Sequence, residues 1–208
     1  ACMTRFLVPL SLALLLATPT LATDPLTLLD VFEVETASDP QISPDGSQIV
    51  YVRRFADLQS DSFYSNLWIV DSDGSSHRPL TSGKLNRFAP RWSPSGDRIA
   101  FISTEEGASS QIWVRYTDTG QMAKLPHHEH APGAPAWSPD GRHLAFTALV
   151  PTAPPAIGDL PSAPEGAEWA EPAKVIDRQF YRFDPIGYLP RGDWHLFTVP
   201  SGGGTAHQ

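Results

Sequence analysis

The sequence predicts an all-β protein, a partial β-propeller of about three four-stranded blades. Three features favour this fold: a tetrapeptide that occurs three times, an alternating apolar run behind each copy, and a composition rich in turn-forming residues. The 208 residues include 21 prolines, 15 glycines and 10% aromatic residues, a mixture typical of short strands joined by tight turns. The hydrophobic content of 41% is sufficient for a buried core.

The tetrapeptide begins at Ser43, Ser93 and Ser138, so its copies are 50 and 45 residues apart. It reads Ser-Pro-Asp-Gly in the first and third copies and Ser-Pro-Ser-Gly in the second. Proline fixes φ at the first corner of a type I turn, and glycine accepts the left-handed conformation that follows. Alternating apolar runs come next, at 49–52, 99–102 and 144–146. Each copy therefore predicts a turn that leads into a strand.

The rest of each repeat completes a blade. Further apolar and aromatic strands are expected at 66–70, 111–114 and 195–199, and shorter final strands at 78–81 and 123–125. Four short strands in a unit of about 45 residues are typical of a propeller blade. The blades are therefore expected at about 39–81, 89–125 and 134–208. Trp92 and Trp137, each directly before a serine, are expected to be buried at equivalent places between neighbouring sheets.

The third repeat is longer than the others, which indicates an insertion at about 148–192. Prolines punctuate its first half, whereas residues 175–181 have the character of a strand. Three blades do not close a ring, since propellers need about four to eight. We therefore expect the chain to be part of a longer protein, with the faces around Leu196, Phe197 and Val199 uncovered.

Residues 1–22 are interpreted as a signal peptide, which leaves an incomplete propeller at 23–208. Arg5 supplies the positive charge, residues 6–17 are apolar, and small residues precede a cleavage point after Ala22. The apolar run is too short for a membrane span, which needs about 20 residues, so we expect export to the periplasm or secretion and no stable membrane anchor. The net charge of -8 argues against a nucleic-acid partner.

Several segments resemble the propeller of prolyl oligopeptidase-family serine peptidases, in the acylaminoacyl-peptidase and dipeptidyl-peptidase-like branch. Residues 26–32 leading into 38–46 resemble the entry into that branch's first blade. The inserted blade of that branch is similar to the segments 179–184, 187–189 and 195–197 of this sequence. The resemblance implies a C-terminal α/β-hydrolase domain with a Ser-Asp-His triad, and a propeller that covers the site and admits short peptides.

No serine of this sequence has the flanking glycines of a nucleophile elbow, Gly-x-Ser-x-Gly, so no triad residue is assigned here. The chain by itself is therefore expected to be inactive, with its partners being the hydrolase domain of the same protein and short peptide substrates. The Ser-Pro-Asp-Gly unit also resembles TolB-like periplasmic propellers. A binding module for a protein or a glycan, without chemistry of its own, is the alternative function.

Two acidic residues are candidates for substrate contact. Glu105 and Glu106 resemble the paired glutamates with which dipeptidyl peptidases hold the amino terminus of a substrate. Their neighbours in the sequence are also typical of an ordinary exposed loop, which is the alternative. His195 lies in an aromatic strand and is expected to be structural.

The most metal-like cluster is His127, His128, Glu129 and His130, because imidazoles beside a carboxylate can ligate zinc or copper. The sequence indicates no distant residue that would complete such a site. We therefore interpret the cluster as a polar loop between the second and third blades, and we expect neither a metal nor a cofactor.

Overall fold

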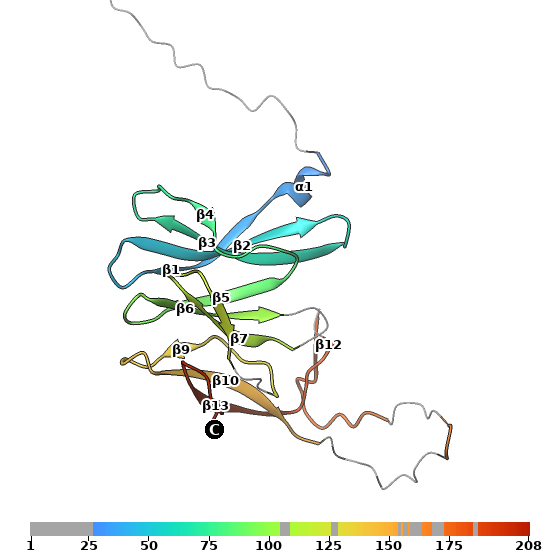
Figure 1. The fold of residues 1–208 in the computed structure, drawn as a ribbon. Coiled ribbons are helices and arrows are strands. Elements are labelled where there is room, and N and C mark those ends of the chain that lie inside the picture. The colour runs from blue at the N-terminus through green and yellow to red at the C-terminus, as the bar shows by residue number, and fades with distance from the viewer. Residues whose placement is uncertain are drawn as a thin grey trace, which may run out of the picture.

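The computed structural model describes residues 27–104, 109–125, 129–153, 155, 158, 164–167, 173–184 and 187–208. The expected signal peptide at 1–22 lies outside these residues. One short helix, α1 (Asp30–Glu33), precedes a succession of antiparallel strands stacked as consecutive blades, as Figure 1 shows. The predicted all-β class is confirmed.

The first blade contains four antiparallel strands in chain order. They are β1 (Thr36–Ile42), β2 (Gln48–Asp57), β3 (Ser62–Asp71) and β4 (Arg78–Pro79). The second blade repeats this order with β5 (Asn86–Trp92), β6 (Arg98–Thr104), β7 (Gln111–Tyr116) and β8 (Met122–Lys124). One parallel bridge, from Ser65 to Asn86, joins the two blades.

The third blade consists of β9 (Ala136–Trp137), β10 (His143–Pro151) and β13 (Gly192–Pro200). A bridge from Thr198 to His207 starts the fourth strand at its outer edge. Between β10 and β13 the chain forms a separate hairpin of β11 (Arg182–Phe183) and β12 (Gly187–Tyr188). The strand expected at 175–181 is wrong: these residues form no strand, and β11 begins only at Arg182.

The three tetrapeptides form equivalent turns, as predicted. In each copy the serine hydroxyl accepts the backbone N–H of the residue five positions later, at 2.9 Å from Gln48, 3.0 Å from Arg98 and 2.9 Å from His143. The glycines have φ values of 74°, 74° and 68°, which an L side chain would strain.

The second turn keeps its carboxylate at a different position from the other two. Ser43 and Ser138 donate to the aspartates of their own tetrapeptides, Asp45 at 2.6 Å and Asp140 at 2.5 Å. In the second copy serine replaces that aspartate, and Ser93 instead donates to Asp97 at 2.7 Å. In the second turn the carboxylate therefore lies two residues later in the sequence, and the equivalent serine hydroxyl still donates to it.

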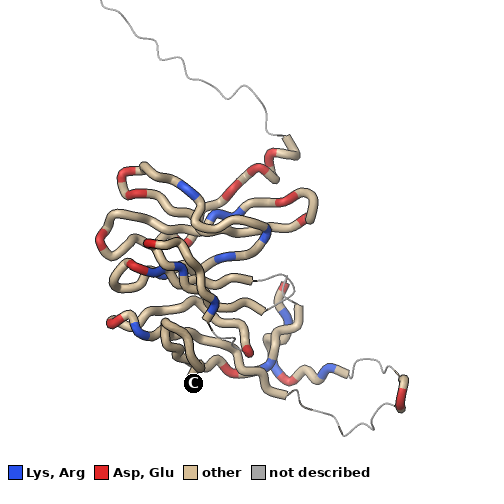
Figure 2. The backbone as a smooth tube through the Cα atoms, viewed as in Figure 1, with Lys and Arg blue, Asp and Glu red and all other residues tan. Residues whose placement is uncertain are grey.

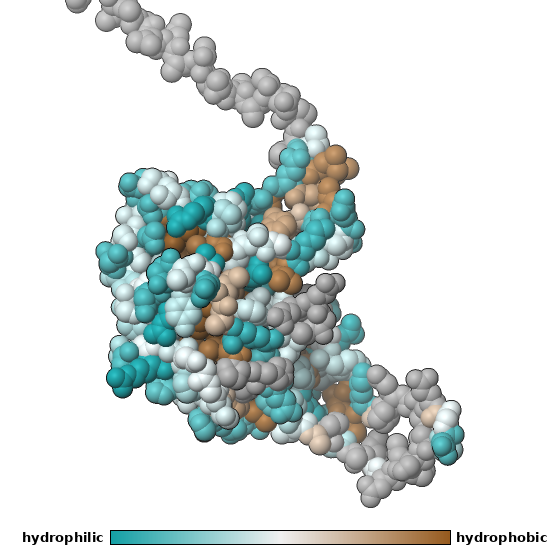
Figure 3. Space-filling view, in the orientation of Figure 1, coloured by the Kyte–Doolittle hydropathy of each residue, from teal (hydrophilic) through white to brown (hydrophobic). Residues whose placement is uncertain are grey.

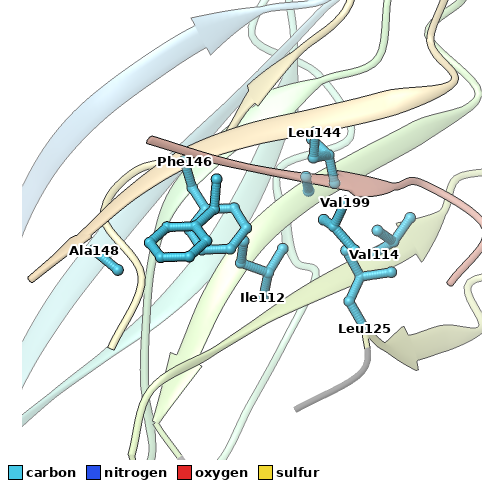
Figure 4. Close-up of a cluster of buried hydrophobic side chains, with 9 residues drawn as sticks. Ile112, Val114, Leu125, Leu144, Phe146, Ala148 and Val199 are labelled. Carbon is cyan, nitrogen blue, oxygen red and sulfur yellow. The ribbon is translucent and has the colours of Figure 1, made fainter. Parts of the chain in front are cut away.

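Two hydrophobic clusters lie between the blades. Val50, Val52 and Leu67 of the first blade pack against Ile99 and Phe101 of the second. The second cluster, shown in Figure 4, joins the second and third blades and contains Ala100, Ile112, Val114, Leu125, Leu144, Phe146, Ala148, Phe197 and Val199. Strand alternation explains this arrangement, because alternate residues of β6 face opposite neighbours.

The expectation of an uncovered face around Leu196, Phe197 and Val199 is wrong for two of the three residues. Phe197 and Val199 are buried against the second blade, whereas Leu196 is 62% exposed. The period of two along β13 gives the physical reason, since Leu196 points to the opposite face of the sheet.

Trp92 and Trp137 occupy equivalent places, but they are half-buried and not fully buried. The indole N–H of Trp92 donates to the carbonyl of Gln41 at 3.1 Å, and that of Trp137 donates to the carbonyl of Arg91 at 2.9 Å. Gln41 and Arg91 stand at the same position of successive repeats. Each tryptophan therefore bonds to the first strand of the preceding blade, β1 for Trp92 and β5 for Trp137.

Candidate functional site

The connections between strands gather at two opposite ends of the blades, visible at the left and right of Figure 1. One end, which we call the turn rim, carries the tetrapeptide turns. The other end carries the β2–β3 turn at 58–61, the end of β6 with the start of β7, and the end of β10 with the start of β13. We call this end the loop rim. Because variable connections on a rigid scaffold often carry function, the loop rim is the candidate site.

The turn rim is acidic and hydrophilic (Figures 2 and 3). Hydrogen bonds from the Ser43 hydroxyl, then from Ser47, lower the pKa of Asp45 to about 2. The pKa of Asp97 is lowered by Ser95 and Ser93, and that of Asp140 by Ser138. Each tetrapeptide serine donates to a carboxylate and accepts a backbone N–H, so its hydroxyl serves the turn. These Ser-Asp pairs therefore have a folding role.

The loop rim of the first blade carries cations beside aromatic and acidic groups. Lys84 pairs with Asp57 at 2.7 Å, which lowers the pKa of Asp57 and raises that of Lys84. The guanidinium of Arg54 lies over the ring of Phe63, 4.0 Å from its centroid. At the start of β5 in the second blade, burial lowers the pKa of Arg87, whose Nη1 donates to the Ser82 carbonyl at 2.6 Å.

In the third blade the loop rim carries the β11–β12 hairpin. Arg178 holds the hairpin base, since its Nη2 donates to the carbonyls of Leu189 at 2.6 Å and Pro190 at 3.2 Å. Arg191 forms an ion pair with Asp177 across the same base. The backbone N–H of Leu189 also donates to the carbonyl of Tyr181 at 2.9 Å, while the backbone N–H of Thr152 donates to the carbonyl of Arg191 at 3.1 Å. The hairpin is therefore tied to the end of β10.

Glu105 and Glu106 lie outside the described residues, so their contact with a substrate stays a prediction. The strand ends on either side of them are described. Thr104 and Ser110 bring their hydroxyl oxygens within 2.9 Å of each other. The connection between β6 and β7 therefore starts and ends at one point of the loop rim.

Of the histidine cluster, His127 and His128 also lie outside the described residues. Within the described part, no group of three histidine, cysteine, aspartate or glutamate residues is close enough to hold a metal ion. His195 lies on β13, and its Nδ1 is 2.7 Å from the Gln208 side-chain nitrogen.

Sequence reasoning missed the exposed aromatic residues of the hairpin. Phe180, Tyr181, Phe183 and Tyr188 are all exposed. Their density within nine positions of the sequence was the available signal. This density of aromatic residues was interpreted as part of a strand, in which some of these side chains would be buried.

The repeated blades and their turns define a protein of the β-propeller class. The profile of the TolB β-propeller domain matches residues 46–152. The chain belongs to this family. In the described residues no helix has the length and apolar character that crossing a bilayer requires.

Curated relatives of two kinds are similar to this chain. The uncharacterized peptidase YuxL of Bacillus subtilis is 36% identical over 96 residues, which cover 46% of this chain and 15% of YuxL. The Tol-Pal system protein TolB of Alkalilimnicola ehrlichii is 38% identical over 80 residues, covering 38% of this chain and 18% of TolB. The chain thus matches less than a fifth of the length of either relative.

A solved structure is similar in fold. The acylaminoacyl peptidase of Pyrococcus horikoshii superposes with a TM-score of 0.64 at 19% identity, over 86% of this chain and 25% of that protein. At this identity the likeness establishes the propeller fold.

Proposed function

We propose that this chain is the propeller portion of an exported serine peptidase that hydrolyses short peptides by acyl transfer. The propeller restricts access to a catalytic α/β-hydrolase domain of the same protein. In this proposal the chain gates substrates and supplies no nucleophile. The catalytic serine and its oxyanion donors belong to the hydrolase domain.

One observation carries this proposal: the loop rim bears an insertion between β10 and β13 that folds as a hairpin of its own. The hairpin contains the residues 182–184 and 187–189, part of the segment whose sequence resembles the inserted blade of the peptidase branch. A hairpin inserted at one end of a propeller narrows the approach to anything placed against that end. The similarity to the peptidase YuxL supports the same function.

The second candidate function is that of a TolB-like propeller, which binds a protein or a glycan and catalyses no reaction. The 38% identity with TolB over 80 residues favours it. The matched family spans 46–152, which includes β2 to β10 but neither β1 nor the hairpin. The family match alone therefore supports both candidates, and the hairpin supports the peptidase.

The test is hydrolysis of acylaminoacyl and dipeptidyl chromogenic substrates by the product of the complete reading frame that contains this chain. We expect turnover that a serine-directed fluorophosphonate abolishes, and background rates from residues 23–208 alone. A folded complete product that neither turns over these substrates nor reacts with the fluorophosphonate would contradict the proposal and leave the binding propeller.

A further inference from the structure

The β11–β12 hairpin carries large apolar side chains that belong to neither hydrophobic cluster of the described residues. Among the described elements, β11 and β12 contact only each other. Phe180 is 77% exposed and Phe183 61%, and Ile176, Tyr181 and Tyr188 are exposed as well. We call these five side chains the hairpin surface. Aromatic residues normally contribute to a protein through the area that they bury, so their exposure here requires another contact.

The backbone below this surface is held in place by the bonds already described. Arg178 bonds to two carbonyls of the returning strand, and Arg191 pairs with Asp177. A surface that is ordered before binding loses less conformational entropy when a ligand arrives. The exposed aromatic side chains are therefore presented on a fixed frame.

The hairpin is locally basic in an acidic chain. Residues 173–191 contain the cations Lys174, Arg178, Arg182 and Arg191 and the carboxylates Asp177 and Asp184, whereas the whole chain has a net charge of -8. Arg191 pairs with Asp177 and Arg182 with Asp184 at 3.7 Å, and two positive charges remain in excess. Lys174 lies 4.5 Å from the ring centroid of Tyr188, so cations and aromatic rings are interleaved on the same frame. Such a surface attracts a ligand that combines carboxylates with apolar groups.

The outer edges of the hairpin add backbone groups to this surface. β11 and β12 form a two-stranded sheet, and each outer edge is unpaired within the described part of the chain. An extended peptide can add to such an edge through its own backbone, with alternate side chains reaching the hairpin surface.

We propose that the hairpin surface binds an extended peptide that alternates apolar and acidic side chains. This inference rests on the proposed function only in its choice of a peptide as the ligand. An anionic membrane is the competing partner for exposed aromatic and basic residues, but it has no backbone that could pair with the outer edges of β11 and β12.

The experiment measures the fluorescence anisotropy of fluorescein-labelled Leu-Glu-Phe-Glu-Leu-Glu titrated with residues 23–208. A peptide with lysine in place of each glutamate is the ligand control. We expect saturable binding of the acidic peptide, weakened about tenfold by Phe183→Thr, because one well-placed aromatic contact carries roughly that factor. Arg182→Gln should weaken binding and reduce its dependence on salt concentration.

Matched variants separate the hairpin from other surfaces of the chain. Phe63→Thr removes an aromatic ring that is 52% exposed beside Arg54 on the same rim, and it should leave binding unchanged. Arg142→Gln removes an exposed cation from the turn rim and should also leave it unchanged. Circular dichroism on each variant confirms that the propeller is folded.

Equal affinity for both peptides, no saturable binding, or equal affinity of Phe183→Thr and the wild type would overturn the inference. Sedimentation with phosphatidylglycerol vesicles that Phe183→Thr abolishes, without peptide binding, would assign the surface to a membrane. A dimer that Phe183→Thr dissociates would assign it to a second copy.

The inference and the proposed function fail in different ways. If peptide binding depends on Phe183 but the complete reading frame yields no hydrolysis, the proposed function fails and the inference stands. If the complete protein hydrolyses peptides while Phe183→Thr retains wild-type affinity and KM, the inference fails and the function stands.

Discussion

Arg98 of the second blade lies over the indole ring of Trp137 of the third, 4.9 Å from the ring centroid. The same guanidinium donates to the Ser201 hydroxyl at 3.0 Å and to the Gly141 carbonyl at 3.1 Å. Arg98 of the second blade therefore contacts three parts of the third blade: the turn at Gly141, the ring of Trp137, and Ser201, which directly follows β13.

Arg98→Lys should lower the free energy of unfolding by about 1–2 kcal/mol, because an ammonium lacks the planar fork that makes both bonds while covering the ring. Urea denaturation followed by tryptophan fluorescence measures the change. Arg142→Lys is the control, since the Arg142 side chain is 80% exposed and should tolerate lysine. Equal stability of Arg98→Lys and the wild type would show that the interblade bonds contribute nothing.

Substitution by phenylalanine should change the stability of the fold differently at Trp137 and at Trp113. Trp137→Phe loses the bond to the Arg91 carbonyl and should destabilise the fold by about 1 kcal/mol. Trp113 has a buried indole nitrogen that lacks a hydrogen-bond partner among the described residues. Trp113→Phe should therefore be neutral or stabilising, because it removes an unsatisfied buried donor.

The same urea denaturation measures both variants. A destabilisation by Trp113→Phe as large as that by Trp137→Phe would mean that the indole of Trp113 has a partner, such as a buried water.

The different position of the carboxylate in the second turn allows an exchange experiment. Asp97→Ser removes the acceptor of Ser93 and Ser95, and it should cost about 1 kcal/mol of unfolding free energy. The double variant Ser95→Asp/Asp97→Ser rebuilds the arrangement of the first turn, in which Ser43 and Ser47 donate to Asp45. It should recover most of the loss.

A double-mutant cycle measures the coupling between these two positions. Additive effects of the two substitutions would show that the turns do not depend on a shared carboxylate, against the equivalence of the three repeats.

Acid should weaken the fold through the turn rim. The folded-state pKa of Asp45 is about 2, below the ordinary value of 3.8, because Ser43 and Ser47 donate to its carboxylate. Its contribution to stability is therefore complete above about pH 4 and is lost as the pH falls toward 2. Urea midpoints between pH 5 and pH 2 should fall less steeply for Asp45→Asn than for the wild type. Asp193→Asn, at an exposed residue of β13, is the control, and identical slopes for all three proteins would contradict this account.

The sequence predicted the blades because each one repeats a local rule. Proline and glycine fix the turn at Ser93. In the strand that follows, alternate side chains point to opposite faces, so Ala100 and Phe101 are separated without any information about the neighbouring blades. The bond from Trp137 to Arg91 could not be predicted, since it depends on how far one sheet is rotated against the next.

The hairpin escaped prediction for a different reason. Apolar residues usually indicate burial, so Val175, Ile176 and Phe180 favoured a strand at 175–181. In the structure Arg178 donates to the carbonyls of Leu189 and Pro190 at the base of the hairpin, and no alternating pattern in the sequence encodes that geometry.

The most direct test of the gating function compares two substrates of the complete reading frame's product. One is a short chromogenic peptide, and the other carries the same sequence at the end of a folded protein. The account predicts that the short peptide is hydrolysed and the protein-borne sequence is not, because the propeller admits only short chains. Hydrolysis of both substrates at comparable kcat/KM would contradict it.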